Sequence, residues 1–222
     1  MSPSESANSP QNAGSQLPGT YHSSPELAQR TDLLRHLIEN SNLIPLVKGA
    51  EGIGKSTFIR HLLELAPENW IAVEIAADVM LQPALLLANL ARRFGLDDRG
   101  EELMERLVSH FDDLRHDGLL PVIIVDDAHL LPEASIIVLL RLHERGEGGS
   151  PLAQILLFAQ PEIDNILKTP QLRVMNLQSL QMLDMPVFTL EQTERFLEHI
   201  LSTGESKSPP LILPVQIEKI LI

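Results

Sequence analysis

A nine-residue stretch of the chain has the composition of a loop that binds phosphate. It consists of Gly49, Ala50, Glu51, Gly52, Ile53, Gly54, Lys55, Ser56 and Thr57, and it matches the pattern G-x-x-x-x-G-K-[ST]. Glycines let successive backbone N–H groups turn toward one anion, and the positive end of a helix that begins near Lys55 adds to the attraction. We therefore expect this loop to bind the phosphates of a nucleoside triphosphate.

Individual side chains of this loop have separate expected roles. Lys55 should reach the β- and γ-phosphates, the Ser56 hydroxyl should ligate Mg²⁺, and Thr57 should contact the side of the α-phosphate. Glu51 is expected to face solvent, because a carboxylate beside the phosphates would oppose binding. The alternative interpretation is a glycine-rich turn that holds no ligand.

A second motif combines an apolar run with two carboxylates. Residues 121–125 read Pro-Val-Ile-Ile-Val and are followed by Asp126 and Asp127, as in a Walker B strand. Asp126 would hold the magnesium shell, and Asp127 would polarise the attacking water. Many ATPases have glutamate at the second position, so hydrolysis through a shifted water and slow hydrolysis both stay open. A loop cap is the alternative for Asp127, and a satisfied loop residue is the alternative to a coupling role for His129.

Two further polar residues are candidates to complete the site. Gln160 follows the apolar run 154–159 and would face the γ-phosphate if that strand lies between the other two motif strands. Arg173 is the only arginine between Arg145 and Arg195. It is therefore the leading candidate for an arginine that one subunit of a ring supplies to its neighbour. The alternatives are a polar strand end and an exposed surface arginine.

The elements that must position these residues alternate along the chain. Apolar runs predict strands at 43–47, 70–76, 121–125, 154–159 and 186–189. Amphipathic segments predict a helix capped by Ser23 or Ser24 that runs to about residue 40, and further helices at 55–66, 82–94, 101–116, 133–145 and 191–201, with Gly95 as a left-handed cap. Strands that are apolar on both faces predict an α/β fold with a parallel sheet, the three-layer αβα sandwich of P-loop NTPases. The binding crevice then lies at the carboxyl ends of the strands.

Composition changes mark the expected domain limits. Residues 1–22 are rich in Ser, Pro, Asn, Gln and Gly and predict a disordered tail. Residues 23–201 form the expected ATPase domain. A Ser/Pro/Gly patch at 202–210 opens a last segment, 202–222, which we interpret as a linker and the start of a small, truncated helical lid.

The composition also excludes classes of function. A formal net charge of −13 repels polyphosphate, so nucleic acid is not an expected partner. Without cysteine the chain has no disulfide, thiol catalysis or cysteine-based zinc site, which fits a reducing compartment such as the cytoplasm. No signal peptide is visible, and the longest uncharged stretches, about 13 to 14 residues, are too short to span a bilayer.

With its motifs placed, the chain resembles AAA+-type ATPases of the ExeA/DamX-like branch, which is associated with bacterial secretion and cell division. The resemblance covers roughly residues 23–201. It is carried by the phosphate loop, by Val-Asp-Asp-Ala-His-Leu-Leu at 125–131 and by Leu-Phe-Ala-Gln-Pro-Glu-Ile at 157–163, where Ala159 replaces a glycine. It implies ATP and Mg²⁺ as cofactors, self-association or a protein partner, and a cytoplasmic location at the inner membrane. Adenine is expected over guanine because no N-K-x-D-like motif follows Asp127.

The chain departs from this branch in two places. Members usually carry an arginine in a Q-R-I-like context after the third motif, whereas residues 176–179 read Asn-Leu-Gln-Ser. The chain also stops at Ile222, before the G-G-x-P-R-like turn of the lid. We therefore expect further domains downstream, and membrane attachment only through regions absent from this chain.

Three functions remain open from the sequence. The first is an ATP-hydrolysing motor or switch that acts on a partner in cell-envelope processes. The second is a nucleotide-dependent scaffold with little or no turnover, favoured by Asp127, the missing arginine and the missing lid. The third is a helper ATPase for transposition or other DNA handling, against which the acidic charge argues.

Overall fold

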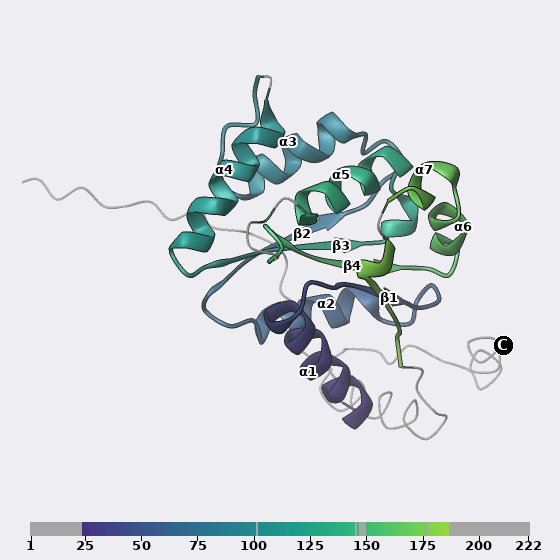
Figure 1. The fold of residues 1–222 in the computed structure, drawn as a ribbon. Helices are drawn as coiled ribbons and strands as arrows, with labels where there is room; N and C mark the ends of the chain where they lie inside the picture. Colours follow the sequence, from purple (N-terminus) through teal and green to yellow (C-terminus); the bar gives the residue numbers. More distant parts are fainter. Residues whose placement is uncertain (1–23, 101, 145, 147–149, 176, 187–222) are drawn as a thin grey trace, which may run out of the picture. The chain divides into compact units, whose positions relative to one another are not determined.

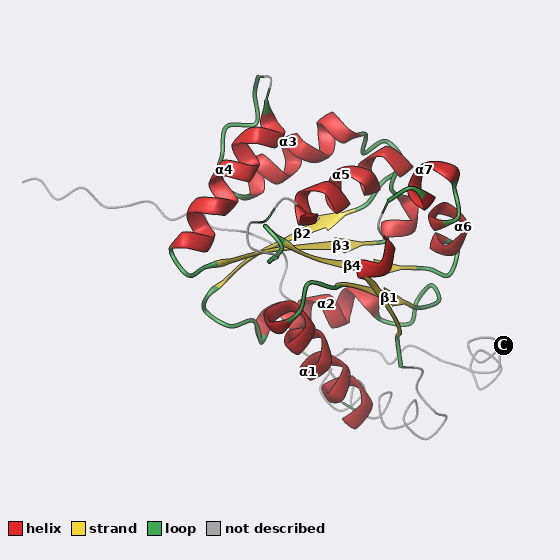
Figure 2. Ribbon diagram, viewed as in Figure 1, coloured by secondary structure: helices red, strands yellow, loops and turns green. Residues whose placement is uncertain are grey.

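The structure, a computed structural model, describes residues 24–100, 102–144, 146, 150–175 and 177–186. Helices and strands alternate along the chain (Figure 2). The α-helices are α1 (Pro25–Asn40), α2 (Lys55–Glu64), α3 (Pro83–Arg93), α4 (Leu103–His116), α5 (Glu133–Glu144), α6 (Ile163–Leu167) and α7 (Pro170–Arg173). The strands are β1 (Ile44–Lys48), β2 (Trp70–Ala76), β3 (Leu120–Asp126), β4 (Gln154–Ala159) and β5 (Leu180–Asp184); the 3-10 helices are η1 (Ala128–Leu130) and η3 (Leu177–Ser179).

The five strands form one parallel sheet in the order β2-β3-β4-β1-β5. Every residue of β3 and β4 is buried, because these strands are apolar on both faces and need cover on both. Helices α3, α4 and α5 lie on one side of the sheet, and α1 and α2 lie on the other (Figure 1). The predicted three-layer αβα sandwich of P-loop NTPases is confirmed.

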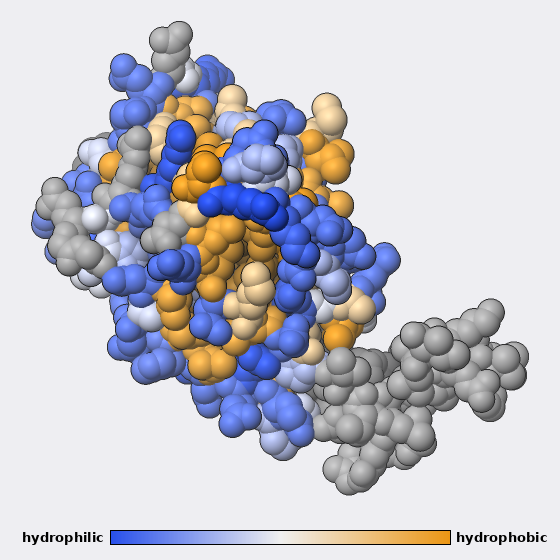
Figure 3. Space-filling view, turned by 45° about the vertical axis from the view of Figure 1, so that its right-hand side comes forward, coloured by the Kyte–Doolittle hydropathy of each residue, from blue (hydrophilic) through white to orange (hydrophobic). Residues whose placement is uncertain are grey.

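The core is aliphatic, with three fully buried phenylalanines among the largest side chains. Phe58 of α2 packs against Phe158 of β4, with ring centroids 6.1 Å apart. This contact fixes the helix that follows the phosphate loop to the strand that carries Gln160. The outer surface shows hydrophilic side chains around a hollow in which apolar side chains gather (Figure 3).

The expected helix ends are present. The hydroxyl of Ser24 accepts the N–H of Leu27 at 3.2 Å and caps α1. Gly95 has φ 77° just after α3, and the N–H of Leu96 donates to the carbonyl of Ala91 at 2.8 Å. This bond closes the last turn of α3 as the sequence predicted.

The last strand differs from the prediction. It lies at Leu180–Asp184, ahead of the strand expected at 186–189, of which Pro186 is described and belongs to no strand. Three of the five residues in β5 are exposed, so this edge strand lacks the apolar run that marks the buried strands. Residues 187–189, the tail 1–22, the helix expected at 191–201 and the linker and lid expected at 202–222 lie outside the described residues. Within the described ranges, no helix is both long and apolar enough to cross a membrane.

Candidate functional site

The sequence motifs meet in one cavity at the carboxyl edge of the sheet. It measures about 330 Å³ and is lined by residues from the phosphate loop, from the turn after β3 and from the end of β4, namely Glu51, Gly52, Gly54, Lys55, Ser56, Thr57, Asp127 and Gln160. Strand β4 pairs with both β1 and β3, which is the order required for Gln160 to face the phosphate loop. Segments that lie far apart in the sequence thus share one cavity of ligand-binding size.

The backbone of the phosphate loop depends on its glycines. Gly52 and Gly54 have φ 75° and 96°, in the left-handed region that glycine adopts without steric cost. A Cβ atom on Gly49 would lie 2.8 Å from Ile53 Cγ2 and 2.9 Å from Met185 Cβ, so this position has no room for a side chain. The N–H of Gly49 also donates to the carbonyl of Ala159 at 3.0 Å, which fixes the start of the loop to β4.

Lys55 folds back over the loop. Its side chain is buried, and Nζ donates to the carbonyl oxygens of Gly49 and Ala50, each at 3.0 Å. The lysine therefore holds the loop in its curved shape and places a positive charge at the cavity. Glu51 is exposed at the mouth of the cavity.

The side chain of Ser56, the residue after Lys55, is hydrogen-bonded to the side chain of Asp126. Ser56 Oγ donates to Asp126 Oδ2 at 2.5 Å, and the N–H of Asp127 donates to Asp126 Oδ1 at 2.9 Å. Asp126 is 7% exposed, so its carboxylate is fixed by both bonds. A hydroxyl and a carboxylate side by side form the hard oxygen donor set that suits Mg²⁺, which takes few protein ligands and completes its shell with water and phosphate. Among the described residues there is no cluster of three or more acidic or histidine side chains for a metal.

Asp127 presents its carboxylate to the cavity from an unusual backbone. Its φ is 53°, and although it precedes η1 its side chain makes no capping hydrogen bond. The loop-cap alternative for Asp127 therefore has no support in this geometry. Behind Asp127, His129 Nδ1 lies 4.0 Å from Asp127 Oδ1 and accepts the backbone N–H of Gln160 at 3.3 Å.

Arg173 does not line this cavity. It is exposed in the short helix α7. An arginine that acts on a neighbouring subunit would lie away from its own cavity, so its assignment as a finger stays a prediction.

Two charged contacts around the site escaped the sequence analysis. Lys48, the last residue of β1, pairs with Asp164 of α6 at 3.2 and 3.1 Å. Glu74 of β2 is half-buried, and burial raises its pKa first, with a further rise from the charge of Asp126. The arginines 60 and 93 oppose that rise. A single carboxylate inside the apolar run 70–76 was the available signal for Glu74.

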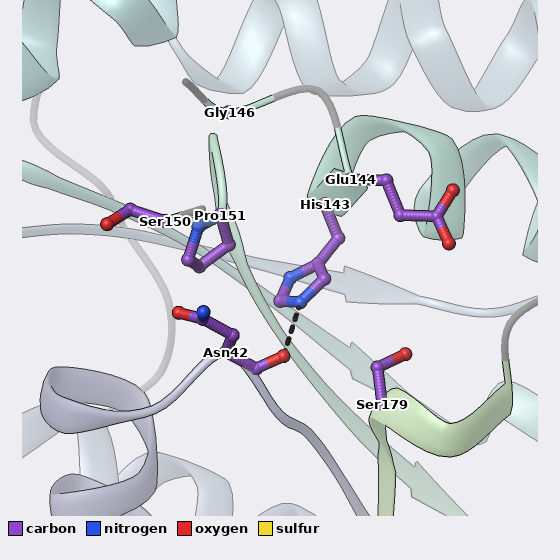
Figure 4. Close-up of a pocket in the computed structure, with 7 residues that line it drawn as sticks. All are labelled: Asn42, His143, Glu144, Gly146, Ser150, Pro151 and Ser179. Carbon is purple, nitrogen blue, oxygen red and sulfur yellow. Dashed lines mark hydrogen bonds between the residues drawn. The ribbon is translucent and has the colours of Figure 1, made fainter. Parts of the chain in front are cut away.

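A second hollow, of about 190 Å³, lies at the amino edge of the sheet (Figure 4). Its lining comes from the segments around β1, β4, β5 and the end of α5, namely Asn42, His143, Glu144, Gly146, Ser150, Pro151 and Ser179. His143 Nε2 lies 3.0 Å from the carbonyl oxygen of Asn42, and Nδ1 lies 3.1 Å from that of Ala153. The Glu144 carboxylate points away from this ring (Figure 4). Because the contacts of His143 are with backbone carbonyl groups, we place the functional site at the carboxyl edge.

Comparison with known proteins agrees with this geometry. Residues 31–167 match the sequence family described as an AAA domain. Among solved structures, the chain is similar to the ORC1 protein of Aeropyrum pernix in complex with DNA, with a TM-score of 0.63 and 19% identity over 87% of this chain and 52% of that chain. The CDC6P structure from Pyrobaculum aerophilum has a TM-score of 0.59 and 20% identity over 90% of this chain and 54% of that chain.

The ADP form of the Aeropyrum pernix ORC2 protein gives a TM-score of 0.60 and 19% identity over 88% of this chain and 55% of that chain. At these identities the likeness shows the fold. The chain spans about half the length of the solved structures it matches. A comparison with curated proteins gave no match.

Proposed function

Because this chain belongs to the AAA domain family, we propose that it binds and hydrolyses MgATP and acts as a motor or switch on a protein partner. The observation that carries the proposal is the shared cavity at the carboxyl edge. Lys55, Ser56, Asp127 and Gln160 all line it, with Asp126 directly behind Ser56. These side chains supply a cation, oxygen ligands and two groups that can position water.

Nucleotide binding depends on Lys55, Ser56 and Asp126. Lys55 exchanges its bonds to the loop carbonyls for bonds to the β- and γ-phosphates, and the loop N–H groups hold the remaining phosphate oxygens. Ser56 and Asp126 would hold Mg²⁺, which when bound would neutralise negative charge on the phosphates. Burial of Asp126 and its bond to Ser56 fix these ligands before nucleotide arrives, so little ordering remains at binding.

Hydrolysis rests on Asp127 and Gln160. The Asp127 carboxylate accepts a hydrogen bond from the attacking water and polarises it. The Gln160 amide orients the same water from the neighbouring strand, because both residues line one cavity on adjacent strands β3 and β4. The water adds to the γ-phosphorus as the bond to the β-phosphate oxygen breaks, which yields ADP and inorganic phosphate.

A nucleotide-gated scaffold with little turnover is the second candidate function. Of the residues that the structure describes, no arginine lines the cavity, so the charge that develops at the γ-phosphate has Lys55 alone beside it. Arginines supplied to such sites accelerate hydrolysis by about 10³ to 10⁵-fold. In this case ATP alters assembly or partner affinity and is not consumed.

The proposal also includes a class of partner for this chain. The motif residues at 125–131 and 157–163 resemble the ExeA/DamX-like branch, which favours a protein partner in secretion or cell division at the cytoplasmic face of the inner membrane. The net charge of −13 favours protein over nucleic acid. The similar ORC1 structure is a complex with DNA, so the experiment below includes DNA as a test condition.

The decisive experiment measures phosphate release and ATP affinity over a range of protein concentrations. Lys55→Ala is the test variant, and Lys168→Ala, an exposed lysine after α6, is the matched control. We expect Lys55→Ala to lose ATP affinity and turnover while the control keeps both. Unchanged ATP binding in Lys55→Ala would contradict the site.

Two further arms separate the candidate functions. ATP binding with wild-type turnover no greater than that of Lys55→Ala would select the scaffold. Turnover per molecule that rises with protein concentration would indicate assembly, and Arg173→Ala then tests the finger. Turnover stimulated by duplex DNA at low salt would favour the DNA-handling alternative.

A further inference from the structure

His129 occupies the space between the two groups that position water. Its imidazole is 9% exposed and is not part of the cavity lining. Nδ1 accepts the backbone N–H of Gln160 at 3.3 Å and lies 4.0 Å from Asp127 Oδ1. The ring does not line the cavity, but it bonds to the backbone of Gln160 and belongs to η1, the turn that Asp127 begins.

The turn η1, which contains His129, packs against β4 and α6, and the hydrogen bond donated by the Gln160 N–H adds a side-chain link between the two turns. Asp127 leaves β3 with φ 53° and starts the single turn η1, and Gln160 starts the turn that leads into α6. Two short turns at the ends of neighbouring strands can shift relative to each other unless a side chain joins them. The bond from His129 to Gln160 joins them.

We propose that His129 is a positioning residue that fixes Asp127 and Gln160 relative to each other for hydrolysis. The proposal rests on the proposed ATPase function, and it adds a role that the phosphate loop and the acidic strand do not by themselves require. Among the described residues, His129 bonds to Gln160 and not to Lys55, Ser56 or Asp126, which form the binding half of the site. Its loss should therefore lower kcat and leave ATP affinity nearly unchanged.

The acceptor role also fixes the state of the ring. Because Nδ1 receives the N–H of Gln160, the neutral imidazole carries its proton on Nε2. Imidazole ¹⁵N chemical shifts report this tautomer without any turnover.

Two substitutions separate the hydrogen bond from simple packing. His129→Asn places an amide oxygen near the position of Nδ1 and can still accept from Gln160, whereas His129→Leu fills space and accepts nothing. His116→Asn, an exposed histidine in α4, is the control for the histidine-to-asparagine change. All four proteins are compared for kcat, ATP affinity, thermal unfolding and the amide shift of Gln160.

We expect His129→Leu to lower kcat about tenfold or more, since small misplacements of reacting groups cost up to about 10²-fold. We expect His129→Asn to stay within a few-fold of wild type, and ATP affinity to change by less than about twofold in both. Unchanged kcat in a folded His129→Leu protein would overturn the proposal. So would an equal loss in both variants, or an imidazole proton on Nδ1. Wild-type turnover no greater than that of Lys55→Ala would overturn this proposal together with the proposed function, which distinguishes the two failures.

Discussion

The two hollows lie at opposite edges of the same sheet and use their polar side chains differently. At the carboxyl edge, polar side chains from several segments face a shared space, and one of them, Ser56, bonds to the side chain of Asp126. At the amino edge, polar side chains bond to backbone carbonyls: His143 faces those of Asn42 and Ala153, and Gln154 donates to that of Ser41 at 2.8 Å. Polar groups that satisfy the backbone stabilise the fold, whereas groups that converge on a cavity remain available for a ligand.

Helix direction explains part of this difference. In this parallel fold α2 begins at the carboxyl edge, where its first N–H groups and positive end favour an anion. Helix α5 ends at the amino edge, where carbonyl groups need donors, and its last turn carries Arg141 and His143. The chemistry of each edge therefore follows from which helix ends meet there.

The largest expected effect comes from removing the charge of Asp126 at the carboxyl edge. Asp126→Asn keeps the shape and can still accept from Ser56, but it loses the anionic metal ligand. We expect phosphate release to fall about 100-fold or more, since metal and oxyanion contacts contribute several kcal/mol. The free energy of unfolding should fall by only about 1 to 2 kcal/mol, because Asn keeps the acceptor for Ser56 and loses that for the N–H of Asp127.

Steady-state phosphate release and urea unfolding measured side by side check both halves of this expectation. Asp117→Asn, an exposed aspartate after α4, is the matched control. A folded Asp126→Asn protein with wild-type turnover would show that the carboxyl edge does not hold the metal as proposed.

The reverse pattern is expected at the amino edge. His143→Leu removes a ring that lies against the carbonyls of Asn42 and Ala153 and donates to one of them, so the free energy of unfolding should fall by about 1 to 3 kcal/mol. ATP affinity and turnover of the folded protein should stay within about twofold of wild type. His143→Gln can still donate to the carbonyl of Asn42 and should lose less.

Urea unfolding of these variants measures the loss of stability. ATP titration under conditions in which each variant is folded measures the affinity. Loss of ATP affinity in a folded His143→Leu protein would mean that the two edges are coupled and that the comparison drawn here is wrong.

Sequence reasoning reached the carboxyl edge more easily than the amino edge for a physical reason. The phosphate loop and the strand before Asp126 are continuous local patterns, and the predicted position of Gln160 needed only the order of three strands. The bond between His143 and Asn42 joins residues 101 positions apart, and the Lys48–Asp164 pair joins residues 116 apart. Such pairs depend on exact register and on which helix end meets which loop, and neither leaves a local signal.

The smallest expected effect comes from substituting Glu74, whose negative charge lowers the stability of the folded protein. Burial and the charge of Asp126 raise the pKa of Glu74 above its ordinary value of 4.5, so the ionised carboxylate destabilises the folded state. Below that ordinary value both folded and unfolded chains are protonated and the cost vanishes. As the pH rises through the raised pKa, the cost appears in full and stability falls.

Glu74→Gln removes the charge and should stabilise the protein at neutral pH by about 0.5 kcal/mol, because solvent screens this half-exposed group. Thermal unfolding of both proteins from pH 4 to pH 8 tests the sign: the two curves should meet at the acid end and separate toward neutral pH. Curves that separate toward neutral pH with Glu74→Gln as the less stable protein would mean that Arg93 and Arg60 outweigh burial and Asp126, and that the carboxylate supports the folded state.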